Sequence, residues 1–133
     1  MKKTALKWFE FTQNNSGGNF TVNGELCHRL FVQAATDDQA VEIAEGLGVY
    51  FDGCENGMDC PCCGDRWYRP SEINFPINYD KNRKFTNVRE YAQFLANEYG
   101  WTTPDARLYY KNGKVVDINK QAPKAKKSRP FEP

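Results

Sequence analysis

Strand-like runs of apolar and aromatic residues occupy the first quarter of the chain. Residues 6–12 are rich in aromatic side chains and are followed by polar residues and glycines at 14–18, which predicts a strand that runs into a loop. Residues 20–22 predict a second strand. After an Asn-Gly turn, residues 26–34 form a longer run that predicts a third strand. We expect these strands to pair as an antiparallel meander.

Two later segments have the capping residues and the apolar spacing of helices. Thr36 begins the first, with Gln39 three residues later as in a capping box. Asn87 and Glu90 begin the second in the same way, and Gly100 ends it. The apolar stripes are Ala40, Ile43, Ala44 and Leu47 in the first helix and Val88, Tyr91, Phe94 and Leu95 in the second.

The remaining segments complete an α+β pattern. Residues 49–51 predict a short strand, and residues 54–79 show little periodicity and contain three prolines, which predicts an irregular segment. Residues 107–118 predict a hairpin around an Asn-Gly turn. The sequence therefore predicts an antiparallel sheet, formed by the N-terminal meander and the C-terminal hairpin and covered by two helices. We expect residues 1–119 to form a single domain, with a cysteine-rich loop at 52–70.

Charge is distributed unevenly, although the formal net charge is only +1. No lysine or arginine occurs between Arg29 and Arg66, and this stretch contains eight acidic residues, from Asp37 to Asp65. Residues 120–133 are instead basic and proline-rich, which predicts a disordered tail. Such a tail either keeps the protein soluble or makes weak, non-specific contacts with nucleic acid.

The apolar runs are too short for membrane insertion. No stretch is long enough for a transmembrane helix, and charged residues interrupt the N-terminal segment before it resembles a secretory signal. We therefore expect the protein in the cytoplasm, without a membrane contact. Because that compartment is reducing, the odd number of cysteines, five, favours metal ligands and free thiols over disulfides.

Four of the five cysteines lie within ten residues, at positions 54, 60, 62 and 63. Cys60 and Cys63 belong to a Cys-Pro-x-Cys-Gly sequence, in which a tight turn directs two thiolates to one side, as in zinc knuckles. The sequence thus predicts a zinc site formed by Cys54, Cys60 and Cys63. A fourth ligand would come from among Cys62, Cys27 and His28, the only histidine. The competing interpretation is a set of small buried thiols without metal.

Other chemistry at this loop fits less well. A glutaredoxin-like redox pair also has the spacing Cys-Pro-x-Cys, but it needs a helix directly after the first cysteine, and residues 64–70 do not resemble one. Calcium would need the ligand order of an EF-hand, which is absent. The acidic residues around the cysteines are then a solvated face of the loop or neighbours of a bound cation.

Residues 65–69, Asp-Arg-Trp-Tyr-Arg, form the next informative string. The guanidinium groups of Arg66 and Arg69, next to Trp67, are suited to a planar anionic ligand or a nucleobase. The alternative is that Trp67 belongs to the core and that Arg66 pairs with a neighbouring acid. Arg66, Trp67 and Arg69 are therefore candidate ligand-binding residues.

Few residues offer a route to catalysis. His28 lies in a predicted strand, and nucleotide-binding loops and the HExxH motif are absent. A small metal-dependent hydrolase would need an open zinc position and a base such as Glu55, Asp59 or Asp65, whereas cysteine-rich zinc sites are normally closed. The sequence favours a non-enzymatic protein, and no catalytic residue is assigned.

The string Cys-Pro-Cys-Cys-Gly-Asp-Arg-Trp at 60–67 resembles one found in a family of small, mostly uncharacterised proteins of tailed bacteriophages. The similarity extends through residues 7–11, 14–18 and 26–29, about the first half of the chain. It implies a phage accessory protein, in the cytoplasm of the host cell, that binds a host protein or a defence component. Three alternatives stay open, a sponge for a nucleotide-like signalling molecule, a nucleic-acid-binding protein and a small metal-dependent hydrolase.

Overall fold

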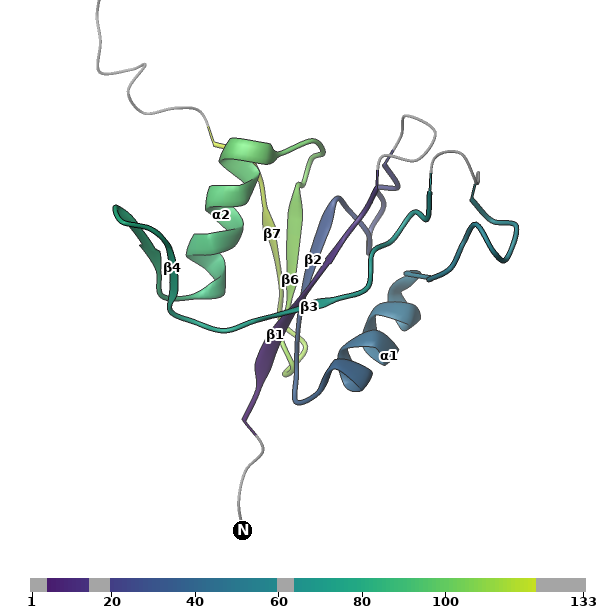
Figure 1. Cartoon of the computed structure of the whole chain (residues 1–133), viewed down its shortest axis with the longest axis horizontal. Helices are drawn as coiled ribbons and strands as arrows, with labels where there is room; N and C mark the ends of the chain where they lie inside the picture. The colour runs from purple at the N-terminus through teal and green to yellow at the C-terminus, as the bar shows by residue number, and fades with distance from the viewer. Residues whose placement is uncertain (1–4, 15–19, 60–63, 122–133) are drawn as a thin grey trace, which may run out of the picture.

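A computed structural model describes residues 5–14, 20–59 and 64–121 of the chain (Figure 1). Its main sheet has five strands in the order β3-β1-β2-β6-β7, and β4 and β5 form a separate two-stranded sheet. In chain order the elements are β1 (Lys7–Thr12), β2 (Arg29–Ala34), α1 (Asp37–Leu47), β3 (Ser71–Ile73), β4 (Ile77–Asp80), β5 (Arg83–Phe85), α2 (Val88–Tyr99), β6 (Ala106–Tyr109) and β7 (Val115–Ile118).

The two helices cover opposite faces of the main sheet, which lies between them in Figure 1. Successive residues of a strand point to opposite faces. In β2, Leu30 and Val32 therefore pack in the cluster that includes the buried residues of α1, whereas Phe31 packs in the cluster that includes those of α2. In β1, Phe9 and Phe11 join the α1 side. The sequence alternation thus produces two cores, one on each face of the sheet.

Three segments that carry the candidate chemistry meet at one end of this sheet. Strands β1 and β2 are antiparallel, with Phe11 opposite Leu30, so the end of β1 lies beside the beginning of β2. Strand β6 runs parallel to β2 and begins at the same end. Beyond β1, Gln13 forms an isolated bridge with Trp67. This end of the sheet therefore gathers three segments. They are the residues before β2, the residues before β6 and the residues that follow the cysteines.

The predicted α+β class and the two helices that cover the sheet are confirmed. Thr36 caps α1 by accepting a hydrogen bond from the backbone N–H of Gln39, and Asn87 caps α2 through the N–H of Glu90. The predicted C-terminal hairpin is also confirmed as β6 and β7. None of the helices among the described residues is both long and apolar enough to cross a lipid bilayer.

Several strand predictions are wrong. Residues 20–22 form no strand, because the backbone N–H and carbonyl of Thr21 bond to the side chain of Gln13 instead of a neighbouring strand. Residues 49–51 form none either, since the N–H of Val49 bonds to Ala44 at the end of α1. The third predicted strand begins only at Arg29.

The segment predicted to be irregular contains two strands. Strand β3 pairs with β1, and β4 pairs with β5 in a small antiparallel sheet. The pairing of β2 with β6 is parallel, so the main sheet is mixed rather than fully antiparallel. The β1–β3 and β2–β6 pairings join residues far apart in sequence, and local patterns contain no signal for them, whereas the β4–β5 pairing is a local hairpin.

Candidate functional site

The peptide before the cysteine cluster is tied to the peptide after it. The carboxylate of Asp59 accepts a hydrogen bond from the hydroxyl of Tyr50 at 2.7 Å and another from the backbone N–H of Arg66 at 2.8 Å. The backbone N–H groups of Met58 and Asp59 both donate to the carbonyl of Gly53. Residues 59 and 66, which flank Cys60, Cys62 and Cys63 in the sequence, are therefore held together.

A second tie involves Cys54 directly. Its backbone N–H donates to the carboxylate of Asp65 at 3.0 Å. Hydrogen bonds from the backbone and the thiol of Cys54 lower the pKa of Asp65. Asp59 and Asp65 thus accept hydrogen bonds from groups of the loop itself, which is a structural role for two residues that sequence analysis considered as a solvated face or a catalytic base.

The predicted zinc ligands are only partly within the described residues. Cys54 is half-buried, whereas Cys60, Cys62 and Cys63 lie outside the described residues. In residues 5–14, 20–59 and 64–121, no three His, Cys, Asp or Glu side chains gather as a metal site. The thiol of Cys54 is a suitable zinc donor, and a complete thiolate site would require the cysteines of the 60–63 segment.

Cys27 has a different environment from Cys54. It is fully buried, and its thiol donates to the carbonyl of Arg29 at 3.2 Å. Burial raises the pKa of the Cys27 thiol to about 12. A metal ligand must be the thiolate. Cys27 is therefore suited to the core rather than to a zinc site.

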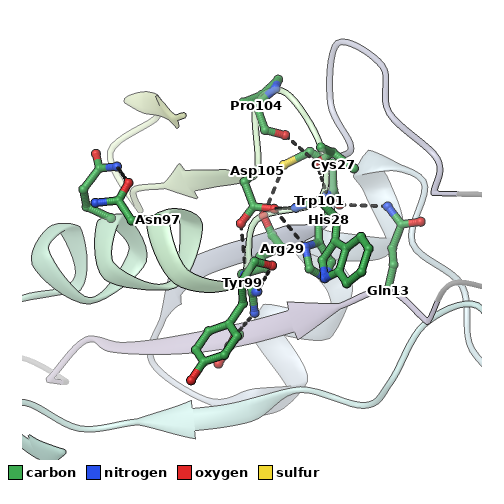
Figure 2. A network of polar contacts seen from close by, with 12 residues as sticks. Gln13, Cys27, His28, Arg29, Asn97, Tyr99, Trp101, Pro104 and Asp105 are labelled. Carbon is green, nitrogen blue, oxygen red and sulfur yellow. Dashed lines mark hydrogen bonds and ion pairs between the residues drawn. The ribbon is translucent and has the colours of Figure 1, made fainter. Parts of the chain in front are cut away.

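His28 belongs to a buried polar network at the end of the sheet (Figure 2). Its Nδ1 lies 2.9 Å from a carboxylate oxygen of Asp105, which also accepts the backbone N–H of Trp101 at 2.9 Å. The other oxygen accepts the Nε of Arg29 at 3.1 Å. Figure 2 shows the Asp105 carboxylate among these groups. Asp105 precedes β6, and its carboxylate connects this position to the beginning of β2 and to the segment after α2.

The ring of His28 also packs against an aromatic residue. Its centroid lies 4.7 Å from that of Phe20, and Phe20 lies 6.3 Å from the exposed Trp101. The imidazole thus contacts both the Asp105 carboxylate and the Phe20 ring. His28 is therefore a buried residue of the fold and not an exposed proton carrier.

The three candidate ligand-binding residues differ in exposure. Trp67 is only 2% exposed and belongs to the core on the α1 side of the sheet. Arg66 is half-buried. The guanidinium of Arg69 is exposed, lies 4.3 Å from the centroid of Phe51 and pairs with Asp52 at 3.2 Å.

A small pocket lies beside these residues. It has a volume of about 370 Å³. Its lining consists of Asn14, Phe51, Asp52, Gly64, Asp65, Trp67, Tyr68 and Arg69. Trp67 and Arg69 thus line one pocket, whereas Arg66 does not. Because two carboxylates share the lining with a single guanidinium, the pocket is less favourable for an anionic ligand than the string of residues 65–69 suggests.

The buried polar network includes residues that the sequence alone did not indicate. Asp105 belongs to no recognisable sequence motif, although its carboxylate forms three hydrogen bonds in the fold. Gln13 likewise bonds through its side chain to Thr21 and to the carbonyl of Cys27. A buried acid or amide in a single sequence has no local signal, because its partners lie far away in the chain.

Comparison with known proteins identifies a family but no activity. The model of a family described as a domain of unknown function, DUF7296, matches residues 6–126. No curated protein and no solved structure matches the chain. Since residues 6–126 make up most of the 133 residues, the chain belongs to the DUF7296 family.

Proposed function

We propose that this protein is a non-enzymatic binding protein and that its contact surface is the acidic layer, formed by α1 and the loop at 52–59. The acidic layer contains the exposed residues Asp37, Asp38, Glu42, Glu45, Asp52 and Glu55. The observation that carries the proposal is that no lysine or arginine interrupts residues 30–65. A surface of a single sign attracts a partner of the opposite sign and accelerates their encounter. The partner is therefore a protein with a basic surface.

The site chemistry supports binding rather than catalysis. Asp59 and Asp65, two candidate bases, accept hydrogen bonds from backbone N–H groups that hold the loop. His28 is buried and bonded to Asp105. With the resemblance of the 60–67 string to phage proteins, these contacts favour an accessory protein that acts in an infected cell on a host or defence component.

Zinc is proposed as the group that organises the loop. The ligands would be Cys54, Cys60 and Cys63, with Cys62 as the fourth, because Cys27 is buried in the core and His28 is buried and bonded to Asp105. Thiolates from one short segment suit a closed, structural zinc site. The support is the pair of ties at Asp59 and Asp65, which hold the two flanks of the cysteine segment together. When bound, zinc would fix the conformation of the loop.

Charge reversal on α1 tests the contact surface. We would compare the proteins captured from a bacterial lysate by the immobilised full-length chain and by Glu42→Lys/Glu45→Lys, both changed at exposed positions. The matched control, Glu72→Lys/Glu98→Lys, makes the same charge change at exposed sites on β3 and α2. The proposal expects a partner that the wild type and the control retain and the α1 variant loses. Capture of the same proteins by all three chains would contradict it.

A nucleotide-like signalling molecule is the second candidate, because the pocket of about 370 Å³ is suited to its base. Asp52 and Asp65 line the pocket, so the phosphates of such a ligand would lie outside it. Tyr68 is 53% exposed and offers an aromatic surface, whereas Trp67 is buried, and Arg69 is the one cation in the lining. A nucleotide that binds there should raise the thermal unfolding midpoint of the wild type, and this increase should disappear in Arg69→Gln. An equal increase in both proteins, or none with a panel of mononucleotides and cyclic dinucleotides, would contradict this second candidate.

A further inference from the structure

A groove lies on the other side of the main sheet, where α2 packs. It has a volume of about 780 Å³, and Phe85 and Phe94 line it together with polar residues of α2 and Gln121. It also contains two cations, Lys84 and Arg89. Because α1 and the acidic layer cover the opposite face, this groove is separate from the surface proposed above.

The cations of the groove are available to a ligand. Lys84 and Arg89 are exposed, and neither forms an ion pair with an acid within the described ranges. Glu90, the acidic residue of the lining, accepts hydrogen bonds from the backbone and the hydroxyl of Thr86. Asp80, nearby on β4, pairs with Arg83 at 3.2 Å. The lining thus carries two positive charges, Lys84 and Arg89, against the one negative charge of Glu90, which leaves a net positive groove.

Two exposed tyrosines lie beside an aromatic ring of the groove. The ring of Phe94, in the lining, lies 5.0 Å from that of Tyr79 and 6.2 Å from that of Tyr99. Tyr79 is 41% exposed and Tyr99 is 50% exposed. The guanidinium of Arg83 lies 5.4 Å from the centroid of Tyr79 and 5.2 Å from that of Phe94. Two exposed rings and a guanidinium plane therefore surround Phe94, which lines the groove.

The chain leaves the described structure at this groove. The backbone N–H of Gln121 donates to the side chain of Asn97, and Gln93 donates to the carbonyl of Asn119. The sequence that follows Gln121 contains four more basic residues, Lys124, Lys126, Lys127 and Arg129. Their positive charge does not complement the groove, so the groove and the sequence after it favour the same kind of partner, an extended anion.

We propose that the groove between α2 and the β4–β5 hairpin binds single-stranded nucleic acid. Lys84 and Arg89 contact phosphates, and the exposed rings of Tyr79 and Tyr99 stack on bases. Proteins that bind single strands combine a basic groove with aromatic platforms in this way. An acidic peptide would use the same cations but gain nothing specific from the rings, so the exposed tyrosines favour the nucleic acid. The basic residues after Gln121 add non-specific attraction.

Fluorescence anisotropy with labelled oligo-dT and oligo-U tests the groove. The full-length wild type should bind with an affinity that falls as salt rises. Lys84→Gln/Arg89→Gln should weaken binding roughly tenfold and reduce the slope of log affinity against log salt by about 1.4, or about 0.7 for each lost phosphate contact. Lys111→Gln/Lys114→Gln, an equal charge change at exposed positions of the β6–β7 turn, should have a much smaller effect. Tyr79→Leu/Tyr99→Leu should weaken binding without changing the slope.

Three results would overturn the proposal. The first is no binding of the wild type at low salt. The second is equal binding by the wild type and Lys84→Gln/Arg89→Gln, with loss only when residues 122–133 are removed, which would assign the affinity to the tail alone. The third is equal binding of poly-glutamate and oligonucleotide with no effect of the tyrosine changes, which would indicate an acidic peptide. None of these results bears on the acidic layer or on zinc.

Discussion

The imidazole Nδ1 of His28 lies 2.9 Å from the carboxylate of Asp105, and the two residues are 77 positions apart in the chain. The same carboxylate bonds to Arg29 and to the N–H of Trp101. Asp105 therefore joins the beginning of β2 to the segment between α2 and β6. This contact stabilises the end of the sheet beside which the cysteine loop lies.

Removal of the Asp105 carboxylate should strongly destabilise the fold. Asp105→Ala removes the closer of two carboxylates at the buried Arg29 and leaves Glu10 at 3.7 Å, so the loss should lie near the lower end of the range of about 3 to 5 kcal/mol expected when a buried ion pair loses one partner. Denaturant unfolding would measure this loss. The exposed pair of Asp80 with Arg83 provides the control, since Asp80→Ala should cost less than about 1 kcal/mol. Similar losses in the two variants would contradict the structural role of Asp105.

The contribution of Asp105 should depend on pH. Burial acts to raise its pKa, but hydrogen bonds from His28 and from the N–H of Trp101, with the charge of Arg29, outweigh burial and lower the pKa. A lowered pKa means that the stability is fully present above the unfolded pKa of about 3.9 and is lost as pH falls through the folded pKa. The difference in unfolding free energy between wild type and Asp105→Ala should therefore shrink below about pH 4. A difference that grows in acid would contradict this sign.

Two glycines near the acidic layer should respond to alanine in opposite directions. A Cβ at Gly53 would collide with the carboxylate of Asp59 and the ring of Tyr50, so Gly53→Ala should break the tie to Arg66 and cost about 1 to 3 kcal/mol. A Cβ at Gly46 in α1 meets nothing within 4 Å, and Gly46→Ala should stabilise the protein by about 0.5 to 1 kcal/mol. Thermal unfolding of both variants checks the pair. Equal effects would indicate that the loop is not held as described.

Cys27 should not react with thiol reagents in the folded protein. It is fully buried, and its thiol has a pKa of about 12. Under native conditions at about pH 8, an ordinary thiol is partly ionised. The number of thiols that react with the reagent should then be the same in Cys27→Ala and in the wild type. In denaturant, the variant should have one reactive thiol fewer than the wild type. A smaller number under native conditions would place Cys27 at an accessible site and reopen its candidacy as a zinc ligand.

Local signals predicted much of the fold. Thr36 with Gln39, and Asn87 with Glu90, lie within one turn of a helix, and both pairs form the predicted caps. The Asn-Gly turn between β6 and β7 is equally local. By contrast, residues 20–22 have the composition of a strand, but the side chain of Gln13 takes the hydrogen bonds of Thr21. The parallel pairing of β2 with β6 depends on contacts across more than seventy residues.

The candidate site was less predictable for the same reason. The sequence drew attention to Cys54 and to the string at 65–69, and the structure places Cys54 against Asp65. It gave no indication that Asp59 joins Tyr50 to Arg66, because acids in a loop more often face solvent. Nor did it connect His28 with Asp105. Such roles depend on which distant groups a polar side chain meets after folding.

Zinc content is the most direct test of the cysteine loop. Cys54→Ser, Cys60→Ser and Cys63→Ser should each lower the zinc bound by the purified protein, whereas Cys27→Ala, changed in the core, should keep it. A chelator should make the loop thiols reactive and leave the two helices intact by circular dichroism. The variants also separate zinc from the partner-binding test on α1, since Glu42 and Glu45 are not ligands.

The decisive measurement is therefore elemental analysis of the full-length wild-type protein, combined with a count of reactive thiols before and after chelation. We expect stoichiometric zinc and loop thiols that react only after the metal is removed. A folded protein without stoichiometric zinc, with Cys60 and Cys63 freely reactive from the start, would contradict this expectation.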